Sequence, residues 1–314
     1  MATTYSEYFI SCDWGTTNFR LRVVERETLM VRKELATGTG IRQLNKDFQE
    51  SGERSRLHFF AGYLQSELAQ LPGEFQQLPI VASGMASSSI GLQELPYASL
   101  PFGADGDSLV SRLLPVGDYR LLLVSGVQGS GDIMRGEEVQ AIGLAGEMKE
   151  DGLLILPGTH AKHLIYRNGT FTDFTTYMTG ELFELLSLHS ILSGSVAPGT
   201  FDDGEREAFL EGVDAGQMGR LTGSLFGVRV RDVVDHLAPS ANYNYLSGLV
   251  IGEELRHLPA DNGRIYLAAT GATHERYRLA LERLVLKDRL TVFHEPVVER
   301  ALLSAHYKLL LQHA

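Results

Sequence analysis

The 314-residue sequence contains a single cysteine, Cys12, and one tryptophan. One cysteine cannot form a disulfide within the chain and offers no cysteine-based metal-ligand pattern, so nothing requires an oxidising compartment. No apolar run approaches the roughly 18 residues that a membrane-spanning helix needs, and no basic segment followed by an apolar stretch opens the chain. These absences predict a cytoplasmic protein without a membrane partner.

Positive charge is also scarce, because 28 Lys and Arg face 39 Asp and Glu, for a formal net charge of −11. Such a balance argues against a nucleic-acid backbone or an anionic membrane as the main partner, although a small phosphorylated molecule can bind locally. Hydrophobic residues make up 44% and charged residues 21% of the chain, as in ordinary globular proteins. At about 150 residues per domain, the length predicts two domains.

A strand–turn–strand pattern occurs twice. Residues 8–12 and 19–24 are expected strands around the turn DWGTTN, and residues 153–156 and 163–166 are expected strands around PGTHAK. At an offset of 143, Gly15-Thr16 aligns with Gly158-Thr159; at an offset of 142, Thr37-Gly38 aligns with Thr179-Gly180. The repeat predicts an internal duplication with a boundary near residue 150 and two halves packed around a cleft.

Other segments have recognisable apolar spacing. Buried strands are expected at 79–85 and 121–127, each followed by a helix. The second half is expected to be the more helical, with helices at 180–192, 206–213, 230–237 and 245–258. It is expected to continue with a strand at 264–269, a turn, a helix, another strand, and a closing helix that begins at Pro296.

The two glycine-bearing turns can carry phosphate chemistry. A carboxylate at a strand end, followed by a Gly-Thr-Thr turn, can hold a hydrated divalent cation while N–H groups and hydroxyls face phosphate oxygens. In the first turn this role falls to Asp13, Gly15, Thr16 and Thr17, and in the second to Gly158, Thr159, His160 and Lys162. The alternative to phosphate binding for the first turn is a plain hairpin turn. For His160 and Lys162 the alternative is an exposed or structural role.

These turns resemble the two phosphate motifs of the superfamily of sugar kinases, actin and the large heat-shock chaperones, and residues 267–277 resemble its adenosine-contacting turn. More closely, the chain resembles the 2-dehydro-3-deoxygalactonokinase family over nearly its whole length. The shared motifs are DWGTTNFR (13–20), SGM with a downstream Ile-Gly (83–91), MRGEEVQ (134–140), PGTHAKH (157–163), MTGEL (178–182) and YLSGLVIGEE (245–254).

The resemblance implies an α/β fold of two duplicated actin-like (ribonuclease H-like) domains, each a mixed five-stranded sheet with flanking helices, around an ATP cleft. Residues 1–150 would carry the sugar-acid side, the first phosphate hairpin and the catalytic carboxylate. Residues 151–314 would carry the second hairpin and the adenosine site with Gly271, and the last helix is a candidate to dock back on the interdomain region. Ala268-Ala269 stands where related kinases often have glycine, which leaves the backbone contact to adenine open.

The implied reaction is the ATP- and Mg²⁺-dependent phosphorylation of the 6-hydroxyl of 2-dehydro-3-deoxygalactonate. Such a transfer needs a carboxylate base, a magnesium anchor and phosphate donors. By position, Glu137 is the expected base, Glu138 its competitor and Asp132 a distant third, while Asp13 would anchor the metal. The alternative is that both glutamates merely favour a helix N-terminus.

A sugar acid also needs a partner for its own carboxylate. Arg135 is the leading candidate and Arg20 the second, although a solvated strand face explains Arg20 as well. Ser83, Gly84 and Met85 could form the floor of the sugar pocket, with core packing an equal explanation for Met85. Two other functions stay open: a kinase of this fold for another sugar or sugar acid, and a nucleotide-gated binding protein without phosphoryl transfer. Homo-oligomerisation is also left open.

Overall fold

The computed structural model describes residues 6–258 and 263–313, which form two compact units. The first unit comprises the chain up to Lys149, residues 168–173, and the chain from Pro296 onward. The second comprises residues 150–167 and 174–295. The chain therefore enters the second unit after Lys149, returns briefly to the first over residues 168–173, and returns to it again at Pro296. The functional roles assigned to 1–150 and 151–314 remain predictions.

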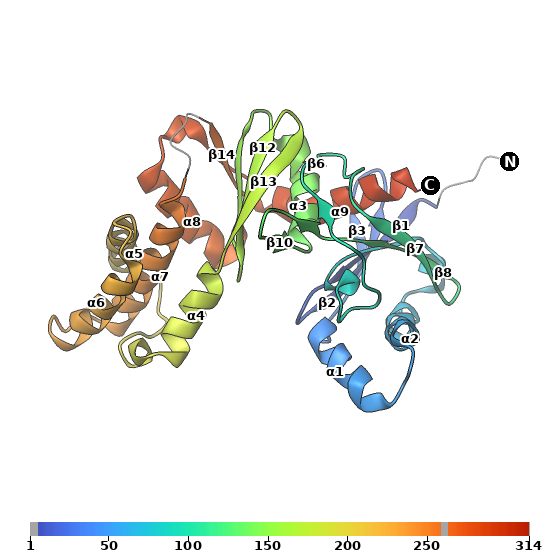
Figure 1. Ribbon diagram of the computed structural model, residues 1–314, viewed down its shortest axis with the longest axis horizontal. Coiled ribbons are helices and arrows are strands. Elements are labelled where there is room, and N and C mark those ends of the chain that lie inside the picture. Colours follow the sequence, from blue (N-terminus) through green and yellow to red (C-terminus); the bar gives the residue numbers. More distant parts are fainter. Residues whose placement is uncertain (1–5, 259–262, 314) are drawn as a thin grey trace. The chain divides into compact units, whose positions relative to one another are not determined.

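The first unit is built on a six-stranded sheet with the order β3-β2-β1-β4-β8-β7 (Figure 1). Strand β1 pairs antiparallel with β2 and parallel with β4, and β4 pairs parallel with β8. The bounds are β1 Tyr8–Trp14, β2 Phe19–Glu25, β3 Val31–Thr37, β4 Ile80–Gly84, β7 Ser111–Val116 and β8 Tyr119–Val124. The first predicted hairpin is thus confirmed.

Successive side chains of β1 point to opposite faces of this sheet, so the two faces contact different parts of the unit. Ile10, Cys12 and Trp14 are fully buried in the same core as Phe60 and Leu64 of α2. The other face carries Ser11 and Asp13 and meets the final helix, where Phe9 stacks on Tyr307. The helices of this unit are α1 Ile41–Ser51, α2 Arg56–Leu68, α3 Glu137–Leu144 and α9 Glu295–Gln312, of which Glu295 belongs to the second unit.

The prediction of a helix directly after β4 is wrong. A single turn, Met85–Ser87, follows the strand, and both the backbone N–H and the hydroxyl of Ser88 donate to the Met85 carbonyl and close that turn. Short strands then lead to α3: β5 Ala98–Ser99, β6 Phe102–Gly103, β9 Val127–Gln128 and β10 Ile133–Met134.

The second unit repeats the order of the first. Its strands run β15-β14-β11-β12-β13, with β11 antiparallel to β12 and parallel to β14, and β14 parallel to β15. This order matches β8-β4-β1-β2-β3 strand for strand, so the predicted duplication and the actin-like α/β fold are confirmed by topology. The expected five strands per sheet are wrong, because β7 adds a sixth strand beside β8 and β6 adds one beside β13. The bounds are β11 Gly152–Leu156, β12 Ala161–Arg167, β13 Thr170–Tyr177, β14 Arg264–Leu267 and β15 Leu290–Val292.

Helices of this unit are α4 Thr179–His189, α5 Asp203–Gly216, α6 Leu221–Val233, α7 Pro239–Leu255 and α8 Gly271–Leu284 (Figure 1). The helix expected at 230–237 ends early, because His236 has a positive φ of 54° that an α-helix cannot contain. Helices α5 and α7 touch backbone to backbone: a Cβ on Gly248 would lie 1.9 Å from the Phe209 carbonyl oxygen. The glycines of YLSGLVIGEE thus allow a close helix contact.

Candidate functional site

The first glycine-bearing turn is held by the start of a helix. The N–H of Ile41 donates to the Gly15 carbonyl (3.0 Å) and that of Arg42 to the Thr16 carbonyl (3.1 Å). Gly40 makes this possible, since a Cβ there would lie 2.4 Å from the Thr16 oxygen. The turn carbonyls therefore satisfy the N-terminal amides of α1, and the Thr17 side chain is exposed.

The second turn is held in the same way by α4. Glu181 N–H donates to the Thr159 carbonyl (3.0 Å), and a Cβ on Gly180 would lie 2.5 Å from the Gly158 oxygen. Gly180 therefore makes the same kind of close contact with its turn as Gly40 does. The expected alignment of Gly180 with Gly38 is wrong, because the matching hydrogen bonds pair Glu181 with Arg42, and a Cβ on Gly38 would meet no atom within 4 Å. The connection from β3 to α1 is longer than that from β13 to α4, which shifts the sequence offset.

Asp13 lies where three strands of the first unit end together. In the sheet register it is opposite Arg20 on β2 and Ser83 on β4. Burial raises the pKa of the Asp13 carboxyl, and the positive charges of Arg20 and Arg22 oppose that shift. A Cβ on Gly84, whose φ is +80°, would lie 3.0 Å from the Trp14 carbonyl oxygen and 3.8 Å from the nearer carboxylate oxygen of Asp13.

Helix α3 begins against this same strand end. Gly136 precedes it with a φ of +118°, and a Cβ there would lie 3.6 Å from the Gly84 Cα. The first residue of α3 is Glu137, which is half-buried and whose Oε2 accepts the Arg135 N–H at 3.1 Å. The structure thus brings Asp13, Ser83, Gly84 and Glu137 to one region of the first unit.

The two adjacent glutamates have different environments. Glu138 is fully buried, and its two carboxyl oxygens lie 2.9 and 2.7 Å from the Gly136 nitrogen, which donates to them. Burial, and next the negative charge of Glu137, raise the pKa of Glu138 to about 8. At neutral pH Glu138 is mostly a protonated, enclosed carboxyl, whereas Glu137 is only half-buried.

The sugar-acid candidates differ in how firmly they are held. Arg135 Nη1 donates to the Ser87 carbonyl (2.7 Å) and hydroxyl (2.6 Å), and its guanidinium lies 4.1 Å from the centre of the Tyr97 ring. Arg20 is exposed and 3.9 Å from a carboxylate oxygen of Glu34. Met85 is half-buried and packs against the apolar core of the first unit. The binding roles of these residues remain predictions.

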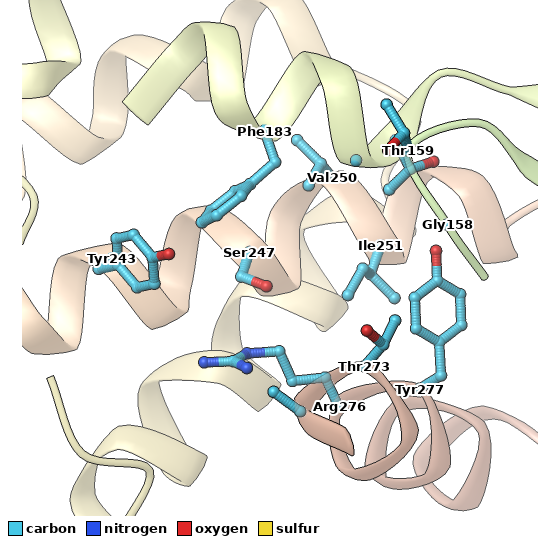
Figure 2. Close-up of a pocket in the computed structure, with 13 residues that line it drawn as sticks. Gly158, Thr159, Phe183, Tyr243, Ser247, Val250, Ile251, Thr273, Arg276 and Tyr277 are labelled. Atoms are coloured by element: carbon cyan, nitrogen blue, oxygen red, sulfur yellow. The ribbon is translucent and has the colours of Figure 1, made fainter. Parts of the chain in front are cut away.

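The second unit contains a pocket of about 320 Å³, within the range of small-molecule sites. Figure 2 shows the Gly158-Thr159 turn and Tyr277 toward one end, with Phe183, Tyr243 and the guanidinium of Arg276 toward the other. The Phe183 and Tyr243 rings meet edge to face at 5.0 Å. The lining residues are Gly158, Thr159, Thr179, Gly180, Phe183, Tyr243, Ser247, Val250, Ile251, Ala272, Thr273, Arg276 and Tyr277.

Sequence reasoning missed Arg276. Its Nη2 donates to the Asn244 side-chain oxygen (3.0 Å), its guanidinium lies 4.7 Å from the centre of the Phe201 ring, and burial lowers its pKa from the usual value. The only sequence signal is its place in 271–284, beside Tyr277 and four residues before Ala280, both of which are buried. An arginine next to the apolar stripe of a helix is a weak indication of a pocket.

A buried carboxylate on α7 connects the walls of this pocket. Glu254 is 2% exposed; its Oε1 is 2.8 Å from His163 Nε2, and its Oε2 accepts the hydroxyls of Tyr277 (2.7 Å) and Thr179. These partners come from β12, α8 and α4 respectively. Glu254, the second glutamate of YLSGLVIGEE, therefore links the second hairpin to both pocket helices, α4 and α8.

The remaining candidates of the second unit lie beside the pocket lining. His160 is exposed, and its Nε2 is 2.5 Å from Glu181 Oε2. Lys162 is 4% exposed, with Nζ 3.5 Å from the His160 carbonyl oxygen. Gly271 has a φ of +59° and donates its N–H to Glu295 (2.7 Å), so this amide of the α8 N-terminus already has a carboxylate partner.

Comparison with known proteins identifies the relatives of this chain. A family model for 2-keto-3-deoxy-galactonokinase matches residues 13–305. The chain belongs to this family. It is 30% identical over 288 residues to the 2-dehydro-3-deoxygalactonokinase of Escherichia coli (strain K12), covering 88% of this chain and 90% of that protein.

Family members from other bacteria align equally well. The Rhizobium meliloti (strain 1021) protein DgoK1, named a probable 2-dehydro-3-deoxygalactonokinase, is 30% identical over 314 residues, covering 96% of this chain and 97% of its own. A crystal structure from Sinorhizobium meliloti, described as a candidate 2-dehydro-3-deoxygalactonokinase, superposes with a TM-score of 0.78 at 28% identity and covers 96% of both chains. The family's fold thus extends over nearly the whole chain.

Among residues 6–258 and 263–313, no group of three or more His, Cys, Asp or Glu side chains is placed to enclose a metal ion. Within the same residues, no helix combines the length and apolarity that crossing a bilayer demands.

Proposed function

We propose that this chain is an ATP-dependent kinase that transfers the γ-phosphoryl group of ATP to the 6-hydroxyl of 2-dehydro-3-deoxygalactonate, in the cytoplasm. The observation that carries the proposal is the match of residues 13–305 to a family named for this kind of kinase. The relatives that share about a third of their residues with this chain bear the same name.

The pocket of the second unit suits an adenine nucleotide. Its apolar walls and the Arg276 guanidinium offer stacking faces for a base, and the Gly158-Thr159 turn lies toward the opposite end (Figure 2). A Cβ on Gly180 would collide with that turn, so the backbone comes close there without a side chain between. In this proposal Lys162 and His160 lie beside the phosphates, and Gly271 forms the turn beneath the adenosine.

Asp13 fits a magnesium site of the kind that kinases use. Mg²⁺ keeps most of its waters and binds one or two carboxylates plus substrate phosphates, so a lone carboxylate is sufficient. Asp13 supplies that oxygen at the end of β1, and its raised pKa means that a nearby cation would stabilise its ionised form. When bound, Mg²⁺ would neutralise charge on the phosphate oxygens. Gly15, Thr16 and Thr17 would offer the phosphates N–H groups and hydroxyls.

Glu137 is assigned as the general base. Its side chain is only half-buried, whereas Glu138 is fully buried and mostly protonated at neutral pH, which makes Glu138 a poor proton acceptor. Glu137 would take the proton of the 6-hydroxyl as that oxygen attacks phosphorus. Arg135, with Arg20 as the alternative, would pair with the sugar carboxylate, and Ser83, Gly84 and Met85 would form the floor beneath the sugar.

The direct test is to incubate the protein with ATP, Mg²⁺ and a panel of 2-keto-3-deoxy sugar acids and hexoses, and to detect phosphorylated products by mass spectrometry. We expect selective formation of 2-dehydro-3-deoxy-6-phosphogalactonate. Product from a different sugar or sugar acid would reassign the substrate. ATP binding without any product would instead favour a nucleotide-gated binding protein.

A further inference from the structure

A histidine of the last helix joins two strands of the first unit. His306 of α9 is fully buried, with Nδ1 2.8 Å from Ser11 Oγ on β1 and Nε2 2.9 Å from Ser83 Oγ on β4. Both serines are 1% exposed. Each ring nitrogen thus has one hydroxyl partner, and the ring orientation is fixed at both ends.

The imidazole of His306 is neutral, since burial, and next the positive charge of Arg22, lower its pKa to about 3. A neutral imidazole has one N–H donor and one acceptor nitrogen. It therefore donates to one of the two serines and accepts from the other. The direction of the hydrogen bond at Nε2 decides whether the Ser83 hydroxyl proton is used inside the protein or is free for another acceptor.

Ser83 is next to the residues assigned to the phosphoryl acceptor side. It is the register partner of Asp13 and precedes Gly84, whose backbone comes close to Asp13 and to the start of α3. Ser11 lies two residues before Asp13 on the same face of β1, away from the strand end. Of the two hydroxyls that His306 holds, that of Ser83 is therefore the one at the candidate site.

We propose that His306 is a positioning residue that fixes the Ser83 hydroxyl for hydrogen bonding to the sugar acid. The inference rests on the proposed function and adds a role for the C-terminal helix, which has no residue among those assigned to the reaction. Its physical basis is that a serine hydroxyl rotates freely unless a partner holds it, and a buried ring anchored at both nitrogens is a rigid partner.

Two substitutions separate positioning from packing. The amide of H306Q reaches about as far as Nε2 and keeps a partner for Ser83, whereas the shorter amide of H306N reaches only as far as Nδ1 and keeps a partner for Ser11. Both remove one buried hydrogen bond, so their thermal stabilities should fall alike. We expect H306N to raise KM for the sugar acid about tenfold, as for one lost hydrogen bond, with KM for ATP unchanged. H306Q should stay within about threefold of the wild type.

Serine variants provide a second route if H306N does not fold. S83A should raise KM for the sugar acid about tenfold, the matched S11A should not, and H306N in the S83A background should add little to S83A. Equal sugar-acid KM values for H306N and H306Q, or a wild-type KM for S83A, would overturn the inference while leaving the kinase activity established. A wild-type protein that phosphorylates no sugar acid would overturn the proposed function and this inference together.

Discussion

The two units share one backbone arrangement, a glycine-bearing turn held by the start of a helix, and differ in the side chains that surround it. In each, a Gly-Thr turn between antiparallel strands is held by the first amides of a helix, with a glycine, Gly40 or Gly180, at the point of contact. In the first unit the neighbouring groups are carboxylates and a buried histidine. In the second they are an apolar pocket and the Glu254 network. The proposed function assigns phosphate binding to both copies of this scaffold, whereas the side chains around the two copies differ.

The carboxylates that distinguish the first unit from the second lead to the prediction with the largest expected effect on activity. E137Q should lower kcat by about a thousandfold, since a carboxamide cannot take the hydroxyl proton and the adjacent Glu138 is mostly protonated, while ATP affinity measured by calorimetry stays near the wild type. E138Q should keep turnover within about tenfold, because Gln preserves the neutral, hydrogen-bonded state. Retained turnover in E137Q together with its loss in E138Q would assign the base to Glu138.

The buried carboxyl also makes the first unit sensitive to pH. The folded-state pKa of Glu138 is about 8, above its ordinary value of 4.5, so its contribution to stability is fully present below pH 4.5 and is lost as the pH rises through 8. Relative to E138Q, the wild-type free energy of unfolding should fall by on the order of 5 kcal/mol across this window. Urea unfolding of both proteins at several pH values measures the difference. If the free energies of unfolding of the two proteins change with pH in parallel, Glu138 has the same pKa in the folded and unfolded states.

The contact between the turn and the helix can be disrupted by substitution in either unit. G40A and G180A should each cost about 2 kcal/mol of stability, because the added methyl group would meet a turn carbonyl at 2.4 or 2.5 Å. G38A is the matched control, since its Cβ would meet nothing within 4 Å, and it should change stability by less than about 0.5 kcal/mol. G180A should also raise KM for ATP. A costly G38A with a neutral G40A would restore the alignment expected from the sequence.

The smallest expected effect concerns the pocket. R276A should raise KM for ATP about tenfold, through loss of a stacking surface for the base, while KM for the sugar acid stays constant. R278A on the same helix is the control, because Arg278 pairs with Glu282 outside the pocket lining. If the two variants have the same KM for ATP, the base does not contact Arg276.

Much of the fold was predictable because its signals are local. Alternation in 19–24, the apolar run at 153–156 and the Gly-Thr turns predicted both hairpins, and the strand orders then confirmed the duplication. The helices α1 and α2 were not expected. The glycine equivalence was also wrong, because a sequence offset cannot measure the length of an irregular connection.

The family, the two turns and the candidate carboxylates can be identified without coordinates, because each depends on residues close together in the chain. Only the tertiary structure separated Glu137 from Glu138, since burial is set by distant segments. It alone brought His306 to Ser11 and Ser83, which are 295 and 223 residues away, and Arg276 to the pocket. A hydrogen bond between remote positions leaves no periodic trace in a single sequence, whereas a turn or a strand does.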